Sequence, residues 1–219
     1  MRSATLEERK KRVKKMIVVL KKRFPDAKIS LRYSSNWELL VAVMLSQQCT
    51  DKKVNEVTSR LFKKYKTLDD YVRAIPSEFE KDIFETGFYR NKTKHILAAA
   101  RMVKEKFRGR MPKTMTDMLA IPGVARKTAN VVLGNAYGVV EGIAVDTHVR
   151  RIALKFDLAT HDDPVRIERQ LMEIIPKKDW FLVTSLFIEY GRKVCPARKH
   201  DCKSHFLTKL YKKAENIWP

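Results

Sequence analysis

The sequence contains only three cysteines among 219 residues, and it has no long apolar run. Three cysteines are too few for a disulfide framework, which also requires an even number. No apolar run approaches the roughly 18–20 residues that are needed to span a bilayer. The charged fraction of 32% also argues against a membrane protein. Because the first eight residues lack an apolar signal region, we expect an intracellular protein.

Segments typical of strands are also scarce. The apolar run at 139–145 is interrupted by Gly142, so we expect a short extended loop there. Apolar residues recur instead at helical spacing, and we predict an all-α protein with about nine or ten helices. The predicted helices with clear bounds cover 6–24, 37–45, 91–109, 164–175 and 179–190. Further helices are predicted after Asp51, in a short segment that ends at Gly87, on either side of the Pro-Gly turn at 122–123, and after Asp146.

Acidic residues are outnumbered by basic ones, 25 against 46, which gives a net charge of +21. Residues 1–30 carry 11 Lys/Arg against 3 Asp/Glu, and residues 192–213 carry 8 against 1. An excess of charge that serves only stability would normally bring glutamate along with lysine. The concentrated basic charge therefore favours a polyanionic partner such as nucleic acid. Since each basic end is too short to fold alone, we expect both ends to meet in one lobe.

The stretch 121–130 reads Ile-Pro-Gly-Val-Ala-Arg-Lys-Thr-Ala-Asn and predicts a helical hairpin. Its Pro-Gly turn connects a short apolar segment to a helix that begins near Arg126 and Lys127. The backbone N–H groups and the positive dipole end of that helix would point into the turn, where a phosphate is the usual partner. Lys127 would then be an amine at a positive helix end and a potential nucleophile. The alternative is an ordinary turn with a solvated lysine.

Four motifs occur in order at 45–51, 86–92, 121–130 and 145–151. Together they resemble the helix-hairpin-helix base-excision DNA glycosylases and are most similar to endonuclease III, over roughly residues 30–202. The resemblance implies two helical lobes with a DNA-binding cleft between them. One would be a helical-barrel domain at 30–138 that contains the hairpin, and the other would combine 1–29 with 139–219. It also implies a monomer, in the cytoplasm with the nucleoid, whose partner is duplex DNA with damaged bases or abasic sites.

The resemblance assigns catalysis to Lys127 and Asp146. In endonuclease III-like enzymes the lysine attacks C1′ of the sugar, forms a Schiff base and allows β-elimination of the 3′ phosphate. The helix N-terminus, burial and the nearby Arg126, Arg150 and Arg151 would favour the neutral amine. The Asp146 carboxylate would offset positive charge on the sugar and assist proton movement. The alternative for Asp146 is a plain N-cap of the following helix.

Other residues are predicted to contact DNA. Phe88 would wedge between base steps and Gln48 would fill the space of the extruded base. The alternative for Phe88 is burial beside Phe84, and the family usually has a leucine-like residue there. His148 would either contact a phosphate or complete the first turn of its helix. The predicted hairpin contacts to DNA come from Gly123, Ala125, Arg126 and Thr128, although Ala125 replaces a glycine and is expected to cost modest affinity.

The C-terminal segment departs from the family pattern. Endonuclease III typically ends with cysteines spaced C-x6-C-x2-C-x5-C that hold an iron–sulfur cluster. This chain has Cys195 and Cys202, but His205 and Tyr211 occupy the third and fourth positions. We therefore predict no cofactor, no metal and no iron–sulfur cluster, with apolar packing of Val194, Phe206, Leu207 and Leu210 as the replacement. A zinc set of the two cysteines with His200 and His205 is the alternative.

The predicted function is that of a bifunctional DNA glycosylase and AP lyase that acts on oxidised or ring-saturated pyrimidines. A second hypothesis is a helix-hairpin-helix glycosylase for uracil or thymine opposite guanine, or for pyrimidine dimers. A third, from another class, is a non-catalytic DNA-binding module that uses the hairpin only to hold phosphates. The presence of both Lys127 and Asp146 argues against the third hypothesis.

Overall fold

The computed structural model describes residues 4–217, and all regular elements in that range are helical. Contacts between Cα atoms divide the chain into two compact units. The central unit is Ser30–Val139, and the terminal unit combines the segment up to Ile29 with the segment from Val140 onward. No helix in the described part of the chain is both long and apolar enough to cross a membrane. The all-α prediction is confirmed for these residues.

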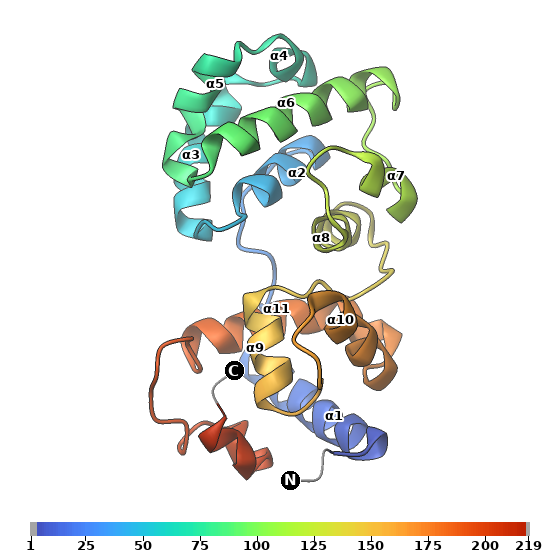
Figure 1. Cartoon of the computed structure of the whole chain (residues 1–219), viewed down its shortest axis with the longest axis vertical. Coiled ribbons are helices and arrows are strands. Elements are labelled where there is room, and N and C mark those ends of the chain that lie inside the picture. The colour runs from blue at the N-terminus through green and yellow to red at the C-terminus, as the bar shows by residue number, and fades with distance from the viewer. Residues whose placement is uncertain (1–3, 218–219) are drawn as a thin grey trace. The chain divides into compact units, whose positions relative to one another are not determined.

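The central unit is built around one fully apolar helix. Its elements are α2 (Asn36–Leu45), α3 (Asp51–Lys64), α4 (Leu68–Arg73), α5 (Pro76–Ile83), the 3₁₀ helix η1 (Phe84–Thr86), α6 (Tyr89–Glu105), α7 (Met115–Ala120) and α8 (Arg126–Tyr137). Every residue from Leu39 to Leu45 is buried, because α2 is apolar on all sides and contacts α3, α6 and α8. Figure 1 shows α2 between α6 and α8.

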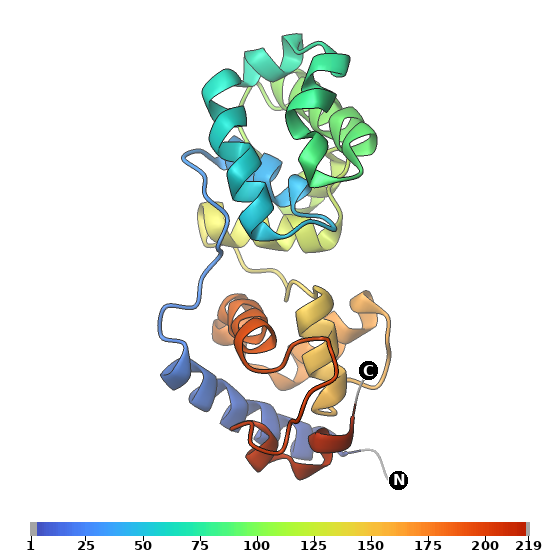
Figure 2. The same cartoon turned by 90° about the vertical axis from the view of Figure 1, so that its left-hand side faces the viewer.

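The terminal unit joins the two ends of the chain. Its elements are α1 (Leu6–Arg23), α9 (Thr147–Lys155), α10 (Pro164–Ile174), η2 (Lys177–Asp179), α11 (Trp180–Lys193), η3 (Thr208–Leu210) and η4 (Lys212–Asn216). A capping box of Thr5 and Glu8 starts α1, which buries an apolar stripe against α10 and α11. Figure 2 shows α1 (blue) beside the segment around η3 (red), and these two elements are in contact.

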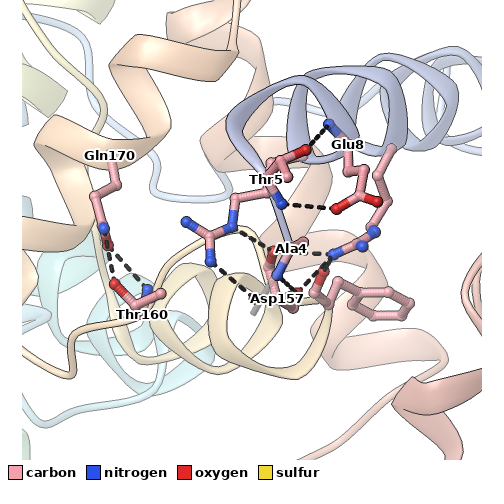
Figure 3. Close-up of polar contacts among 9 residues, drawn as sticks. Ala4, Thr5, Glu8, Asp157, Thr160 and Gln170 are labelled. Carbon is pink, nitrogen blue, oxygen red and sulfur yellow. Dashed lines mark hydrogen bonds and ion pairs between the residues drawn. The ribbon is translucent and has the colours of Figure 1, made fainter. Parts of the chain in front are cut away.

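A polar cluster around Asp157 fastens α1 to the end of α9 (Figure 3). Nη2 of Arg9 lies 3.1 Å from Oδ1 of Asp157, and the backbone N–H of Ala4 donates to Oδ2. Nη1 of Arg12 donates to the carbonyl oxygen of Asp157 at 2.9 Å, and its guanidinium lies 3.7 Å from the ring centre of Tyr211. Part of the basic charge near the N-terminus therefore stabilises the unit internally, which its composition alone did not indicate.

The helix boundaries differ from the prediction at several places. Thr50, not Asp51, is the N-cap of α3, and its hydroxyl accepts from the N–H of Lys53. The helix predicted at 91–109 is Tyr89–Glu105, and α4 was not predicted at all. Residues 139–145 form an extended loop, as expected.

Candidate functional site

The hairpin of the central unit is formed by α7, a tight turn and α8. Gly123 has φ +78°, a conformation that side chains rarely adopt. A Cβ atom at this position would lie 2.7 Å from Cβ of His95 and 2.8 Å from Cε of Met44. The turn can therefore pack against α6 and α2 only because residue 123 is glycine. The predicted hairpin is confirmed, with its second helix starting at Arg126.

The first turn of α8 has no side-chain cap. Ala125 occupies the N-cap position and offers no oxygen to the N–H groups of the helix. Its φ is −90°, an ordinary value, so the backbone does not require the glycine that Ala125 replaces. Lys127 is exposed and Thr128 is buried. The start of α8 is thus suited to an external anion, with an exposed amine one residue into the helix.

The exposure of Lys127 removes one predicted cause of its reactivity. Burial was expected to favour the neutral amine, and in the structure this side chain is exposed. The other predicted causes involve arginines that have interactions of their own. Arg150 pairs with Asp162, and Arg151 is buried and donates to the carbonyl oxygens of Gly191 and Cys195. Two of the predicted causes, the dipole of α8 and the charge of Arg126, belong to the first turn of the same helix as Lys127.

Gln48 and Phe88 both stand in strained turns of the central unit. Their φ angles are +53° and +49°, which is uncommon for residues other than glycine. Both are exposed, and 61% of Phe88 is accessible. This exposure excludes the alternative that Phe88 is buried beside Phe84. The ring of Phe84 packs on Tyr89 instead, with ring centres 4.9 Å apart. An exposed aromatic ring on a strained turn fits a role in binding better than one in packing.

Lys92 connects the two turns. Its ammonium donates to the carbonyl oxygens of Leu45 and Thr86, each at 2.8 Å, and the residue is buried. Leu45 ends α2 three residues before Gln48, and Thr86 precedes Phe88 by two residues. Loss of water around the amine lowers the pKa of Lys92. The role of Lys92 was not predicted from the sequence, because a lysine in an amphipathic helix is normally solvated.

Asp146 belongs to the terminal unit and caps α9. Its Oδ1 accepts from the N–H of Val149 at 2.8 Å, so the predicted N-cap is present. His148 lies in the first turn of α9, with Nδ1 3.2 Å from Nη2 of Arg151. A Cβ at Gly191 would lie 2.5 Å from Nδ1 of His148, so the imidazole packs directly against the backbone of α11. The capping bond engages one carboxylate oxygen of Asp146, and Oδ2 is not part of it.

The model of the HhH-GPD superfamily of base excision DNA repair proteins matches residues 41–177. Endonuclease III of Synechocystis is 44% identical over 210 residues, which cover 96% of both chains. Endonuclease III of Bacillus subtilis is 41% identical and covers 88% of both chains.

The chain belongs to the HhH-GPD superfamily. A solved structure of endonuclease III in a non-covalent complex with DNA superposes with a TM-score of 0.89 at 41% identity, over 94% of this chain and 96% of that one. A structure of a trapped covalent endonuclease III–DNA intermediate matches equally well. A thermostable thymine-DNA glycosylase, at 20% identity and a TM-score of 0.82, shares the fold.

Membership settles the class of enzyme. The chain is an endonuclease III-type DNA N-glycosylase and AP lyase of base excision repair, and its partner is DNA. The hypothesis of a non-catalytic DNA-binding module is therefore wrong. The residues that perform each step are not fixed by membership alone.

The prediction that the chain binds no metal is not supported. Cys195, His200, Cys202 and His205 come together in the terminal unit and could hold a metal ion. His200 was expected to face solvent and belonged only to the alternative zinc set. The apolar packing predicted for the same segment is present only in part, since Leu207 is buried and Leu210 is 40% exposed.

Proposed function

We propose that this protein removes oxidised or ring-saturated pyrimidines from duplex DNA and cleaves the resulting abasic site, with Lys127 as the nucleophile. One observation carries the assignment to Lys127. Its exposed amine stands at the uncapped start of α8, directly after the glycine turn, where the phosphates beside a target sugar would be held. Gly123, Ala125, Arg126 and Thr128 supply that hold in the proposal.

The proposed reaction proceeds through a Schiff base. Nζ of Lys127 attacks C1′ of the flipped nucleotide, and the damaged base leaves with the electron pair of the glycosidic bond. Loss of the amine proton and ring opening give an iminium between Nζ and C1′. Removal of a proton from C2′ then breaks the bond between C3′ and its oxygen, so the 3′ phosphate leaves. Water finally hydrolyses the iminium and frees the lysine.

Asp146 and the exposed turns have supporting roles in this proposal. The Asp146 carboxylate balances positive charge that develops on the sugar and accepts or returns protons. Phe88 enters the base stack and Gln48 occupies the space that the extruded base leaves. His148 contacts a phosphate of the DNA backbone. The strained φ angles and the exposure of Phe88 and Gln48 support these two assignments.

Borohydride trapping tests Lys127. Borohydride reduces the iminium to a stable amine, so wild type and abasic DNA should give a covalent adduct of the protein. Lys127→Ala should give none, while Lys63→Ala, which removes an exposed lysine from α3, should trap like wild type. An adduct that persists in Lys127→Ala would assign the chemistry to another amine.

Asp146→Asn separates catalysis from capping. Asparagine caps helices about as well as aspartate, so α9 should remain intact while the charge is lost. We expect the glycosylase rate to fall by roughly 10²-fold or more, with little change in thermal stability or DNA affinity. Single-turnover rates with a ring-saturated pyrimidine provide the measurement. An unchanged rate would leave Asp146 as a cap only.

A panel of duplexes tests the lesion. We expect excision of oxidised and ring-saturated pyrimidines under single-turnover conditions. Preferred excision of uracil or thymine opposite guanine, or of a pyrimidine dimer, would replace the proposed substrate while leaving the role of Lys127 testable by trapping.

A further inference from the structure

Four potential metal ligands converge after α11. The ligand atoms of Cys195, His200, Cys202 and His205 all lie within 4.8 Å of one another. Sγ of Cys202 is 3.4 Å from Nε2 of His200, and the two imidazole rings stack with centres 5.0 Å apart. In a tetrahedral zinc site, bonds of about 2.3 Å to sulfur and 2.0–2.1 Å to nitrogen put neighbouring ligand atoms roughly 3.3–3.8 Å apart. The spacing of these four ligand atoms is therefore close to the spacing of ligands around a single ion.

The same set does not fit a four-iron cluster. Such a cluster takes four thiolates, each on a different iron atom, and the described residues here offer two. The ligands of an iron–sulfur cube also lie farther apart than the ligands of one ion, because they surround a larger group. Two thiolates and two imidazoles at close spacing are a donor set typical of zinc.

The histidines are oriented for coordination. Nδ1 of His200 lies 2.7 Å from the carbonyl oxygen of Arg198, which makes Nδ1 the protonated nitrogen. The lone pair is then on Nε2, the nitrogen that faces Cys202. A metal-bound histidine commonly donates its second N–H to a carbonyl in this way. Nδ1 of His205 is buried without a hydrogen-bond partner, and a bound ion is one of the usual partners of such an atom.

The backbone around Cys195 is held firmly. Its N–H donates to the carbonyl oxygen of Tyr190 at 2.9 Å, and its carbonyl accepts from Arg151 at 2.8 Å. Cys195 is completely buried and Cys202 almost so. An ion bound here would thus link the end of α11 to the segment that leads into η3.

We propose that Cys195, His200, Cys202 and His205 bind one zinc ion, in place of an iron–sulfur cluster, and that this ion fastens the segment after α11 to the terminal unit. The inference is independent of the proposed substrate and nucleophile. It concerns the stability of the terminal unit, since a structural zinc ion contributes its binding free energy to folding.

Metal analysis of the full chain tests the proposal. Protein expressed without a histidine tag should contain roughly one zinc ion per chain and neither iron nor acid-labile sulfide. Cys202→Ser and His205→Gln should lose most of the zinc, whereas Cys49→Ser and His161→Gln should retain it. A chelator should lower the Tm of wild type, and added zinc should restore it.

Two results would overturn the proposal. One is iron with acid-labile sulfide in purified wild type. The other is metal-free wild type that also fails to take zinc from a chromophoric chelator. Both measurements use the wild-type chain and do not depend on the folding of a variant. Borohydride trapping on the same preparation reports on Lys127 separately.

Discussion

Lys92 is a single side chain that bonds to the backbone beside two exposed turns. It is the buried cation of the central unit and satisfies two carbonyl groups that end α2 and η1. Both groups lie next to turns with positive φ, at Gln48 and Phe88. Because a buried carbonyl without a donor is costly, the ammonium stabilises both turns at once.

Lys92→Met should lower the free energy of unfolding by about 1–3 kcal/mol for each carbonyl left without a donor. It should also weaken binding to lesion-containing DNA, because the turns at Gln48 and Phe88 would no longer be held. Urea unfolding and fluorescence anisotropy provide the measurements. Lys94→Met, at an exposed position of the same helix, is the matched control. Equal effects of the two substitutions would contradict the role of Lys92.

For individual residues, the sequence predicts those that act within a local motif and misses those whose partners lie far along the chain. Asp146 was recognised because an N-cap and its helix are neighbours in sequence. Lys92 was missed because its partners are 47 and 6 residues away. The group of Cys195, His200, Cys202 and His205 was predicted only as an alternative, because the loop lacks a paired C-x2-C spacing.

The α7–α8 hairpin shows what an element requires of a single position. Gly123 combines a positive φ with close contact to two neighbouring helices, whereas Gly109 has φ +75° and open space around it. Substitutions at the two glycines therefore distinguish the cost of backbone strain from the cost of close packing.

Gly123→Ala should reduce stability more than Gly109→Ala. Strain at positive φ costs each variant about 1–3 kcal/mol, and only the first variant must also move His95 and Met44. We expect weaker DNA binding for Gly123→Ala alone, because the start of α8 would shift with the turn. Chemical unfolding and DNA titrations check both statements. Similar losses of affinity in the two variants would argue against the hairpin as a phosphate site.

Long periodic helices were predicted well, whereas the short helix α4 was missed. Eighteen residues of α1 carry enough apolar repeats to identify the helix, while the six residues of α4 carry too few. The cap of α3 was placed one residue late because Thr50 and Asp51 are both good capping residues. Only the geometry of the turn distinguishes them.

At the scale of the whole molecule, buried tyrosines in both units predict alkaline sensitivity. Burial raises the pKa of Tyr65 to about 12, and its hydroxyl donates to Asp82. Burial also raises the pKa of Tyr71 in the same unit and of Tyr190 in the terminal unit. Above pH ~10 the unfolded chain releases these protons while the native protein keeps them.

The free energy of unfolding should therefore be unaffected by these groups below pH ~10 and fall as the pH rises from there towards 12. Tyr65 alone should contribute a loss of about 2–3 kcal/mol. Urea unfolding at pH 8 and pH 11.5 measures the fall, and Tyr65→Phe should show a smaller one. If the variant and wild type lose the same stability, the protonated tyrosine is not the cause.

The cluster around Asp157 has a consequence for biosynthesis. It fixes α1 to a residue that follows it by about 150 positions, and the terminal unit also needs the segment after α11. The central unit, in contrast, is one continuous stretch. During translation the central unit can fold as soon as residue 139 has left the ribosome, while the emerged α1 must wait for its partners. The first helix to be synthesised is thus among the last to be packed, and its capping box favours the helical conformation in the meantime.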